Sequence, residues 1–420
     1  MLPDKIKLFV EIFRVAIPFL GRIIIERIQA SYHRWTYKAI PSPKNVVIVG
    51  GSFAGFELAK RLCESLPTGY RVVLVEKNSH LHYVFAFPRF SVVSGYEKGA
   101  FIPYSGIARN APKGIFQLVQ DEVVRISDDS VILASGEELP YEYLTIATGT
   151  SQLPPAKLSA THKEEACKEL QTAQENIQNA NSIAVVGGGA VGIEMATDIK
   201  SFRPEKDVTL INSRDHILPQ FGPRLQSYAL GAIRKQNIKV ILGERPQIVA
   251  PGSGELRFGD GQTSSYDLII RCTGQTPNSG LIMDWSPQSV SKETKRILVD
   301  PNLRLENLGD EAPHVFAVGD VAETGAPKMG RAGHMQAAVV ASNIVKLIQG
   351  KPNKLEKYVS NRELEGATKL TLGKAEGVIY ITDGGRKEIL VPFNRVSEDM
   401  DIRRVWGMFG VKFSEGASSE

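Results

Sequence analysis

Two short apolar runs dominate the hydrophobic pattern of the chain: VVIV at residues 46–49 and IAVV at residues 183–186. Neither run has a polar position, which is typical of parallel strands that are buried on both faces. Each is followed by a glycine-rich turn, a stretch of helical character and a second apolar run, at residues 72–75 and 208–211. This order predicts two strand–turn–helix–strand units in an α/β fold.

The turn of the first unit has the features of a dinucleotide site. Gly50 permits a tight turn and Gly55 lets the helix pack closely on the strand, while unpaired N–H groups at the helix N-terminus can bind a pyrophosphate. Glu76 ends the second strand, where a carboxylate can accept the ribose hydroxyls. Ser52 replaces the middle glycine of the G-x-G-x-x-G motif, but a small hydroxyl still fits beside a phosphate and can donate a hydrogen bond. The unit therefore predicts dinucleotide binding.

The second unit carries an unmodified motif, formed by Gly187, Gly189 and Gly192. The duplication implies two nucleotides in one chain, one held tightly and one that exchanges. The second unit ends in NSR at residues 212–214, with no acid where the first unit has one. The absence of a carboxylate, with Arg214 two residues on, favours or at least permits NADPH. Alternatively, Arg214 is a solvated surface residue and the site does not distinguish NADPH from NADH.

Other stretches are expected beside a nucleotide. The segment 80–91 is rich in aromatic residues and is either core packing or a wall against an isoalloxazine ring, with Arg89 near the phosphates or the ring edge. The small-residue turn at Thr148 and Gly149 lets a backbone approach a ligand closely. Asp320 follows a further strand and precedes a helix, where its carboxylate can accept hydrogen bonds from a ribityl chain.

Residues 1–44 have a different pattern. Apolar residues recur there at intervals of three and four, which places them on one stripe of a helix; they are Ile6, Phe9, Phe13, Ile17, Leu20, Ile24 and Ile28. The other side gathers charges, namely Asp4, Lys7, Glu11, Arg14, Arg22 and Glu26. Because charges interrupt the apolar positions, the segment cannot span a bilayer, and Pro18 should kink the helix or start a second one. It is either an interfacial helix in a membrane surface or a helix packed on the protein's own body or on a second subunit.

Composition and charge narrow the class of protein. The 420 residues leave room for two or three domains, and 42% hydrophobic and 23% charged residues are typical of a soluble globular protein. Residues 1–44 hold eight Lys and Arg against three Asp and Glu, a balance of +5, whereas the whole chain carries +4. The remaining chain is thus almost neutral, which argues against nucleic-acid binding and for an anionic surface met by the N-terminus. Three scattered cysteines, Cys63, Cys167 and Cys272, indicate neither a disulfide framework nor a metal site.

The order of the motifs resembles that of two-dinucleotide-domain flavoprotein oxidoreductases, over residues 45 to about 350: VVIVGGSFAG, ATG, VVGGGAVGIE, CTGQTPN and VFAVGD. Within that class the chain most resembles the apoptosis-inducing-factor-like mitochondrion-associated proteins, also called ferroptosis suppressor proteins, with type II NADH:quinone oxidoreductases as cousins. The resemblance implies an α/β fold with two Rossmann-like dinucleotide-binding domains, the second inserted in the first as in glutathione reductase, and a small C-terminal α+β module. The implied parts are an N-terminal segment and linker (1–44), an FAD-binding domain in two pieces (45–155 and 280–350), an NAD(P)-binding domain (156–279) and the C-terminal module (351–420).

The resemblance also implies the ligands and their contacts. FAD is expected at the first turn, in contact with Gly50, Gly51, Ser52, Ala54, Gly55, Glu76, Lys77, Arg89, Val123, Ala147, Thr148, Gly149 and Asp320. NADH or NADPH is expected at the second turn, in contact with Gly187, Gly189, Ala190, Val191, Gly192, Asn212, Ser213, Arg214 and Gly274. Glu194 matches the glutamate of the family's G-x-x-x-E pattern, at the junction of nicotinamide and flavin; it either orients the nicotinamide or is a structural partner.

The reaction expected is electron transfer from NAD(P)H through FAD directly to a diffusible acceptor, because Cys63 falls mid-helix and Cys272 on a strand rather than as a redox pair. A lipid-facing helix beside the flavin favours a membrane quinone as the acceptor. The alternatives are a reductase of a protein electron carrier, such as a ferredoxin, and a nucleotide-responsive redox-signalling protein. The expected location is the cytoplasmic face of a membrane, such as the mitochondrial outer membrane or a lipid droplet, without secretion; a homodimer remains open.

Overall fold

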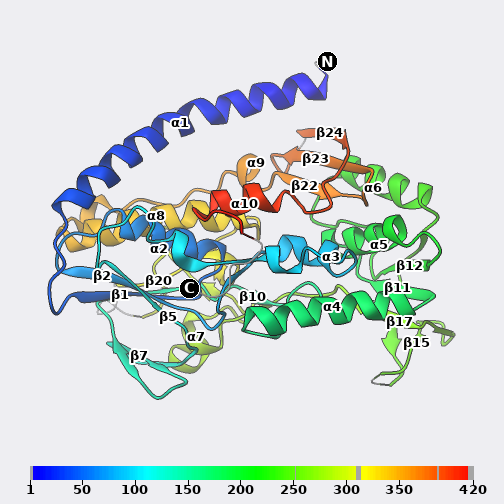
Figure 1. The fold of residues 1–420 in the computed structure, drawn as a ribbon, viewed down its shortest axis with the longest axis horizontal. Coiled ribbons are helices and arrows are strands. Elements are labelled where there is room, and N and C mark those ends of the chain that lie inside the picture. The colour runs from blue at the N-terminus through cyan, green and yellow to red at the C-terminus, as the bar shows by residue number, and fades with distance from the viewer. Residues whose placement is uncertain (1–2, 251, 309–313, 386, 415–420) are drawn as a thin grey trace.

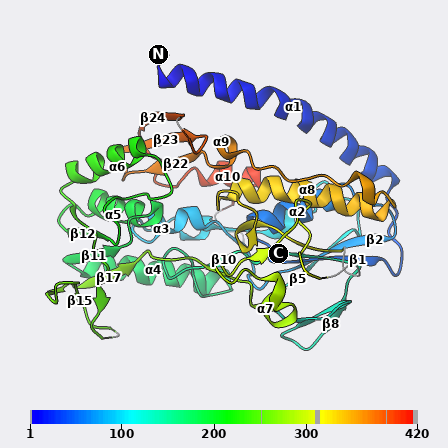
Figure 2. The ribbon, with the colours of Figure 1, turned by 180° about the vertical axis from the view of Figure 1, so that it is seen from behind.

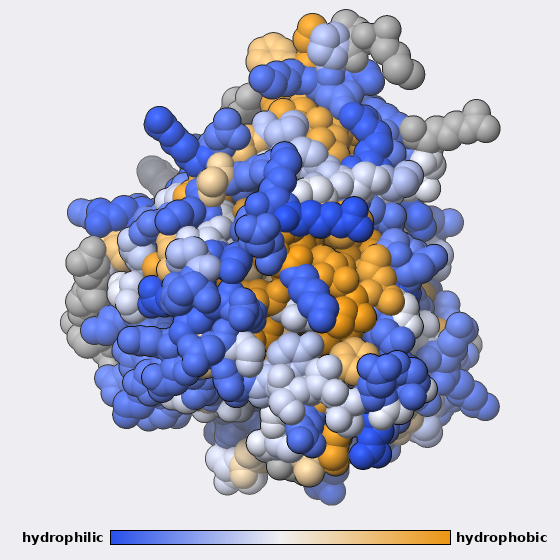
Figure 3. All heavy atoms as spheres, turned by 90° about the vertical axis from the view of Figure 1, so that its right-hand side faces the viewer, coloured by the Kyte–Doolittle hydropathy of each residue, from blue (hydrophilic) through white to orange (hydrophobic). Residues whose placement is uncertain are grey.

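The computed structural model describes residues 3–250, 252–308, 314–385 and 387–414, with the backbone alone at residues 15–20 and 22–24. Two parallel sheets lie end to end along the molecule, and the long helix α1 (Asp4–Thr36) arches along one side of the molecule, above the helices and strands that cover these sheets (Figure 1). The same arrangement is seen from behind in Figure 2. The end that carries α6 and β12 has a mostly hydrophilic surface with a hydrophobic patch near its centre (Figure 3).

Five parallel strands form the first sheet, and their order shows that the chain leaves this sheet and later returns to it. β1 lies between β2 and β9, with Val46 opposite Val72 on one side and Tyr143 on the other. β20 completes the sheet by pairing with β9. In spatial order the strands are β20 (Val315–Ala317), β9 (Tyr143–Ile146), β1 (Lys44–Val49), β2 (Tyr70–Val75) and β5 (Phe116–Val119).

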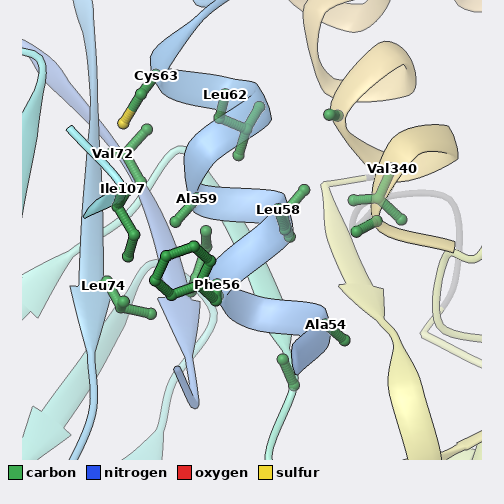
Figure 4. Close-up of a cluster of buried hydrophobic side chains, with 14 of the residues drawn as sticks. Ala54, Phe56, Leu58, Ala59, Leu62, Cys63, Val72, Leu74, Ile107 and Val340 are labelled. Atoms are coloured by element: carbon green, nitrogen blue, oxygen red, sulfur yellow. The ribbon is translucent and has the colours of Figure 1, made fainter. Parts of the chain in front are cut away.

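The helix α2 (Phe53–Cys63) packs between this sheet and α8 (Gly330–Ile348), and its apolar side chains form the centre of the first core (Figure 4). Leu58 and Leu62 are completely buried, and each such side chain contributes about 2 kcal/mol to stability. Gly333 allows a close approach, because a Cβ there would lie 3.0 Å from the Cβ of Ala54. The packing therefore brings the N-terminal turns of α2 and α8 together.

The second sheet has four parallel strands and is inserted between β9 and β20 of the first. In spatial order its strands are β13 (Lys239–Leu242), β12 (Asp207–Asn212), β11 (Ser182–Val186) and β17 (Leu268–Arg271). Its helices are α4 (Lys163–Asn179), α5 (Ala190–Phe202) and α6 (Pro223–Lys235). The chain crosses between the sheets at the antiparallel pair β10 (Thr150–Ser151) and β18 (Thr276–Pro277). The predicted fold class, with one dinucleotide unit inserted in the other, is confirmed.

Antiparallel strands complete the molecule. They are β6 (Val123–Ile126), β7 (Ser130–Leu133) and β8 (Glu138–Pro140); β14 (Gln247–Ile248), β15 (Glu255–Arg257) and β16 (Thr263–Ser265); and, near the C-terminus, β22 (Thr368–Thr371), β23 (Glu376–Thr382) and β24 (Glu388–Asn394). The short elements are α3 (Phe87–Phe90), α7 (Gly280–Trp285), α9 (Arg362–Glu365), β3 (Leu81–His82), β4 (Phe101–Ile102), β19 (Ile297–Leu298) and β21 (Ala322–Glu323). After β24, the helix α10 (Ile402–Met408) returns to the first core, where buried Trp406 donates from Nε1 to the Gly99 carbonyl at 2.8 Å.

The helix α1 is a single element of 33 residues. The expectation that Pro18 starts a second helix is wrong, because one helix continues past this residue. In Figures 1 and 2 the helix curves along its length. Its described apolar side chains at the predicted positions, Ile6, Phe9, Phe13 and Ile28, are 46–65% exposed, whereas the side chains of Ile17, Leu20, Arg22 and Ile24 lie outside the described residues. In the described part of the chain, every helix is too short or too polar to cross a membrane.

Candidate functional site

A single cavity of about 3890 Å³ runs along the junction of the two sheets. Both glycine-rich turns open into it, together with the first turns of α2 and α5. The carboxyl ends of β1 and β11 therefore face one shared space, as in α/β folds that bind ligands beyond the ends of parallel strands.

The glycines of the first turn leave no room for side chains. Gly50 has a φ of +101°, and a Cβ there would lie 2.6 Å from the Ala147 carbonyl oxygen. A Cβ at Gly55 would lie 1.8 Å from the Gly50 carbonyl oxygen, so only glycine lets α2 begin this close to β1. Ser52 lines the cavity just before α2, and its side chain makes no capping hydrogen bond. The Ser52 hydroxyl and the first N–H groups of α2 are thus available to a phosphate.

Glu76 follows β2 and turns its carboxylate toward this turn. The carboxylate accepts hydrogen bonds from the backbone N–H of Gly51 and, at 2.8 Å, from that of Asn78. Burial raises the pKa of Glu76, and these two hydrogen bonds oppose the effect. A carboxylate held at this strand end is the usual acceptor for ribose hydroxyls.

The second turn repeats the packing of the first. Gly187 has a φ of +127°, and a Cβ there would lie 2.4 Å from the Cys272 carbonyl oxygen. A Cβ at Gly192 would lie 1.9 Å from the Gly187 carbonyl oxygen. At Gly189, by contrast, a Cβ would meet no atom within 4 Å, which leaves open space at the N-terminus of α5. This glycine-rich turn and the N-terminus of α5 form a cradle, a concave backbone surface that fits a second pyrophosphate.

Asn212 takes the place of the acid in the second unit. Its Oδ1 accepts from the Gly188 backbone N–H at 2.9 Å, and its Nδ2 donates to the His216 carbonyl at 2.7 Å. The next two residues, Ser213 and Arg214, are exposed and line the cavity, as does Arg245. A hydroxyl and two guanidinium groups near this strand end are suited to an additional phosphate group.

Glu194 lies in the second turn of α5 and lines the same cavity. Its Oε1 accepts from the backbone N–H of Thr371 at 3.2 Å and from the Thr371 hydroxyl at 3.1 Å. Burial raises the pKa of Glu194 to about 7; the nearby Asp198 carboxylate adds to the increase, and Thr371 and Arg89 oppose it. The carboxyl is thus poised to exchange a proton near neutral pH.

The expectation that Arg89 reaches the cofactor needs correction. The Arg89 side chain is buried, lies outside the cavity lining, and pairs with Asp198 through two contacts of 2.7 Å. It also donates to the Gly373 carbonyl at 3.2 Å. A buried guanidinium needs such partners because an unpaired charge would be costly. Arg89 therefore joins α3, α5 and the loop after β22, one layer behind the cavity.

Asp320 follows β20 at the edge of the first sheet and faces several cations. Burial raises the pKa of Asp320, whereas Lys157, Lys328 and Arg296 lower it. All four residues line the cavity. The two return turns also meet here, because the Thr148 hydroxyl donates to the Asn278 carbonyl at 2.7 Å.

Most of the predicted contacts line the cavity: Gly50, Ser52, Ala54, Glu76, Lys77, Val123, Ala147, Thr148, Gly149, Asp320, Gly187, Gly189, Ala190, Val191, Glu194, Asn212, Ser213, Arg214 and Gly274. Gly51, Gly55 and Gly192 lie behind the lining. They act through close packing, because Cβ atoms at these positions would come within 2.9 Å or less of neighbouring atoms.

An aromatic cluster at one side of the cavity was not predicted from the sequence. Phe53, Phe85 and Phe409 all line the cavity, and the ring of Phe53 lies 5.1 Å from that of Phe85 and 6.0 Å from that of Phe409. Phe85 is 47% exposed, so the cluster is accessible. The three residues come from distant parts of the chain, and only the aromatic segment 80–91 gave any signal. A flat, apolar ligand can pack on these rings.

Two dinucleotide cradles that open into one cavity define a two-nucleotide flavoprotein oxidoreductase. The chain belongs to the pyridine nucleotide-disulphide oxidoreductase family, whose model matches residues 44–343. It is 32% identical over 397 residues to Fe-regulated protein 8 of Mycosarcoma maydis, with 88% of this chain and 95% of the relative covered. It is 31% identical to ferroptosis suppressor protein 1 of Xenopus tropicalis, with 79% and 87% covered. The fold matches the sulfide:quinone oxidoreductase of Aquifex aeolicus with a TM-score of 0.68 at 18% identity, covering 87% of this chain and 90% of that one.

The family and the relatives confirm the predicted resemblance and cofactors: the protein is an FAD-dependent oxidoreductase that uses NAD(P)H. The family's name refers to a disulphide, but the three cysteines of this chain, Cys63, Cys167 and Cys272, are free thiols. Burial raises the pKa of Cys272 to about 12 and that of Cys167 to about 11, so neither is a thiolate at neutral pH.

Proposed function

We propose that the protein passes electrons from NAD(P)H through FAD to a quinone dissolved in a membrane, without a redox-active cysteine. The observation that carries the proposal is the continuity of one cavity from both dinucleotide turns to the exposed aromatic cluster. Relatives named ferroptosis suppressor protein and a fold neighbour named sulfide:quinone oxidoreductase support a quinone as the acceptor.

In this proposal each glycine-rich turn holds one of the two nucleotides. FAD is held at the first turn, where Ser52 and the α2 N-terminus meet the pyrophosphate and Glu76 meets the ribose. NAD(P)H exchanges at the second turn, where Arg214 accepts either nucleotide. FAD, when bound, takes a hydride from NAD(P)H and passes electrons to the acceptor.

Glu194 orients the nicotinamide in this proposal. Thr371 occupies one carboxyl oxygen, Oε1, with two hydrogen bonds, which leaves Oε2 for the carboxamide of the nicotinamide. Because the pKa of Glu194 is raised to about 7, the carboxyl can either donate or accept this bond near neutral pH.

The acceptor packs on Phe53, Phe85 and Phe409, and the helix α1 provides the peripheral membrane contact through residues 6–28. Most of its described apolar side chains, Phe9, Phe13 and Ile28 among them, are exposed rather than packed on the body, which favours a lipid surface. We place the protein on the cytoplasmic face of a membrane, such as the mitochondrial outer membrane or a lipid droplet.

Steady-state rates with a ubiquinone analogue and with a ferredoxin-type iron–sulfur protein test the proposal. We expect NAD(P)H oxidation to be much faster with the quinone. A higher kcat/KM for the iron–sulfur protein would instead identify a reductase of a protein carrier.

A further inference from the structure

The acidic residues of α1 face the body of the protein, where each is paired with a cation. They are the only acids among residues 1–44. The pairs are Asp4–Arg224, Glu11–Lys387 and Glu26–Arg61. The helix is therefore docked through its charged side, the reverse of a surface helix that buries an apolar stripe.

The three cations belong to separate parts of the molecule. Arg224 lies in α6 beside the second sheet, Lys387 directly precedes β24, and Arg61 lies in α2 on the first sheet. In Figures 1 and 2, α1 extends from the end of the first sheet to the region of β24 and α6. One helix thus connects both sheets and the C-terminal strands.

The hydrogen bonds of these pairs keep the carboxylates charged. The hydrogen bond from Arg224 lowers the pKa of Asp4, and that from Lys387 lowers the pKa of Glu11. Arg14 adds a further contact, donating to Glu363 of α9 at 2.7 Å. At neutral pH the docked side of α1 is thus held by ion pairs.

The outward side of α1 is apolar and basic. Phe9, Ile28, Tyr32 and Trp35 are 61–89% exposed. The exposed charged residues beside them are Lys5, Arg27, Arg34 and Lys38. With all three acids engaged on the opposite side, the described outward side chains carry no negative charge, so this side complements anionic lipid headgroups.

The last turns of α1 also border the cavity. Arg27, Ala30 and Arg34 line it, together with Lys60 of α2 and Lys346 of α8. We call this part of the cavity, lined by α1, α2 and α8, its mouth. A membrane surface that binds the outward side of α1 would therefore lie next to the mouth.

We propose that α1 acts as a brace, by which we mean a helix that ion pairs of Asp4, Glu11 and Glu26 fix to three parts of the body. Its outward side binds an anionic bilayer and so holds the mouth of the cavity against the membrane. The inference rests on the proposed function, because a lipid-dissolved acceptor then enters beside α1. The occupant is a bilayer rather than a second copy of the chain, since two such helices would bring their basic side chains together.

The test uses the full-length, FAD-loaded protein and the double variant Asp4→Asn/Glu11→Gln. Neither residue lines the cavity. The matched control is Glu142→Gln/Glu205→Gln, which removes one half-buried and one exposed acid that pair with Lys44 and Lys206 away from α1. NADH oxidation is measured with a short-chain quinone in solution and with a long-chain quinone in phosphatidylcholine–phosphatidylserine vesicles, alongside vesicle co-sedimentation.

We expect the brace variant to bind vesicles and to reduce the soluble quinone as the parent does. Its rate with the vesicle-borne quinone should fall about fivefold, the factor by which two surface ion pairs shift an equilibrium, whereas the control should not change. An unchanged rate with the vesicle-borne quinone would overturn the brace. Failure of the parent to reduce even the soluble quinone would overturn the proposed function instead.

Hydrogen exchange tests the brace independently of turnover. On vesicles, the parent should gain protection in α1 and at the cavity mouth of α2 and α8, whereas the brace variant should gain it in α1 alone. Equal protection of the mouth in both proteins would contradict the proposal. So would a dimer in solution that vesicles fail to dissociate, because a second copy would then occupy the outward side of α1.

Discussion

Glu76 and Asn212 occupy equivalent positions in the two halves of the molecule. Each stands at the end of the second strand of its unit, and each accepts a backbone N–H of its glycine-rich turn, from Gly51 and Gly188 respectively. The shared hydrogen bond shapes both turns, but at this position only the first unit has a carboxylate, because Asn212 is a neutral amide. The difference between the two side chains sets the electrostatics of the two sites.

Glu76→Gln should weaken FAD binding about tenfold, because a neutral amide replaces a charged acceptor of ribose hydroxyls. Flavin lost on ultrafiltration measures the effect. Glu122→Gln is the control, since Glu122 also lines the cavity but pairs with Lys77 at 3.5 Å. Equal flavin retention in the Glu76 variant and the parent would count against this role.

Arg214→Ala should lower kcat/KM for NADPH about tenfold, because the variant lacks the exposed guanidinium that we propose as the partner of the 2′-phosphate. The value for NADH should be almost unchanged. Arg257→Ala, in β15 and outside the cavity lining, controls for the loss of positive charge. Equal losses with both nucleotides would show that Arg214 does not discriminate between them.

The sequence-based predictions that the packing supports concern local geometry. A glycine that must approach the backbone five residues away, such as Gly55 against Gly50, is visible in a short motif. Arg89 is the contrary case, because its partner Asp198 lies 109 positions further along. Nothing near Arg89 in the sequence distinguishes a buried ion pair from a cofactor contact.

The aromatic cluster and the docking of α1 depend on long-range packing in the same way. Phe409 reaches Phe53 only because α10 folds back onto the first core. The periodicity of α1 identified its two sides, but the cations that bind its acids, such as Arg224 and Lys387, come from unrelated segments. Hydrophobic pattern alone therefore did not show which side faces the body.

Two glycine substitutions should have opposite effects on stability. Gly192→Ala places a Cβ 1.9 Å from the Gly187 carbonyl oxygen and should destabilise the protein by about 3 kcal/mol, with loss of NAD(P)H binding. Gly231→Ala, at an exposed helical position with no atom within 4 Å, should stabilise it by about 1 kcal/mol. Thermal unfolding compares the two variants; a lower Tm for the Gly231 variant would contradict this view of α6.

Glu194 should make stability depend on pH. Its pKa rises from 4.5 to about 7 on folding, so between these values the folded state binds more protons than the unfolded state, and stability falls as the pH rises. Glu194→Gln stays neutral and should gain on the order of 2 kcal/mol relative to the parent between pH 5 and pH 8. Chemical denaturation at the two pH values measures the difference, and parallel curves would contradict the raised pKa.

The most direct measurement of the central claim is an anaerobic absorbance titration of the purified protein. We expect a flavin spectrum that NADH or NADPH bleaches and that a stoichiometric amount of a ubiquinone analogue restores, with the same result when the three cysteines are replaced by serine. A flavin that NAD(P)H bleaches but the quinone leaves reduced would contradict quinone as the acceptor, and a cysteine-free variant that no longer transfers electrons would contradict direct transfer.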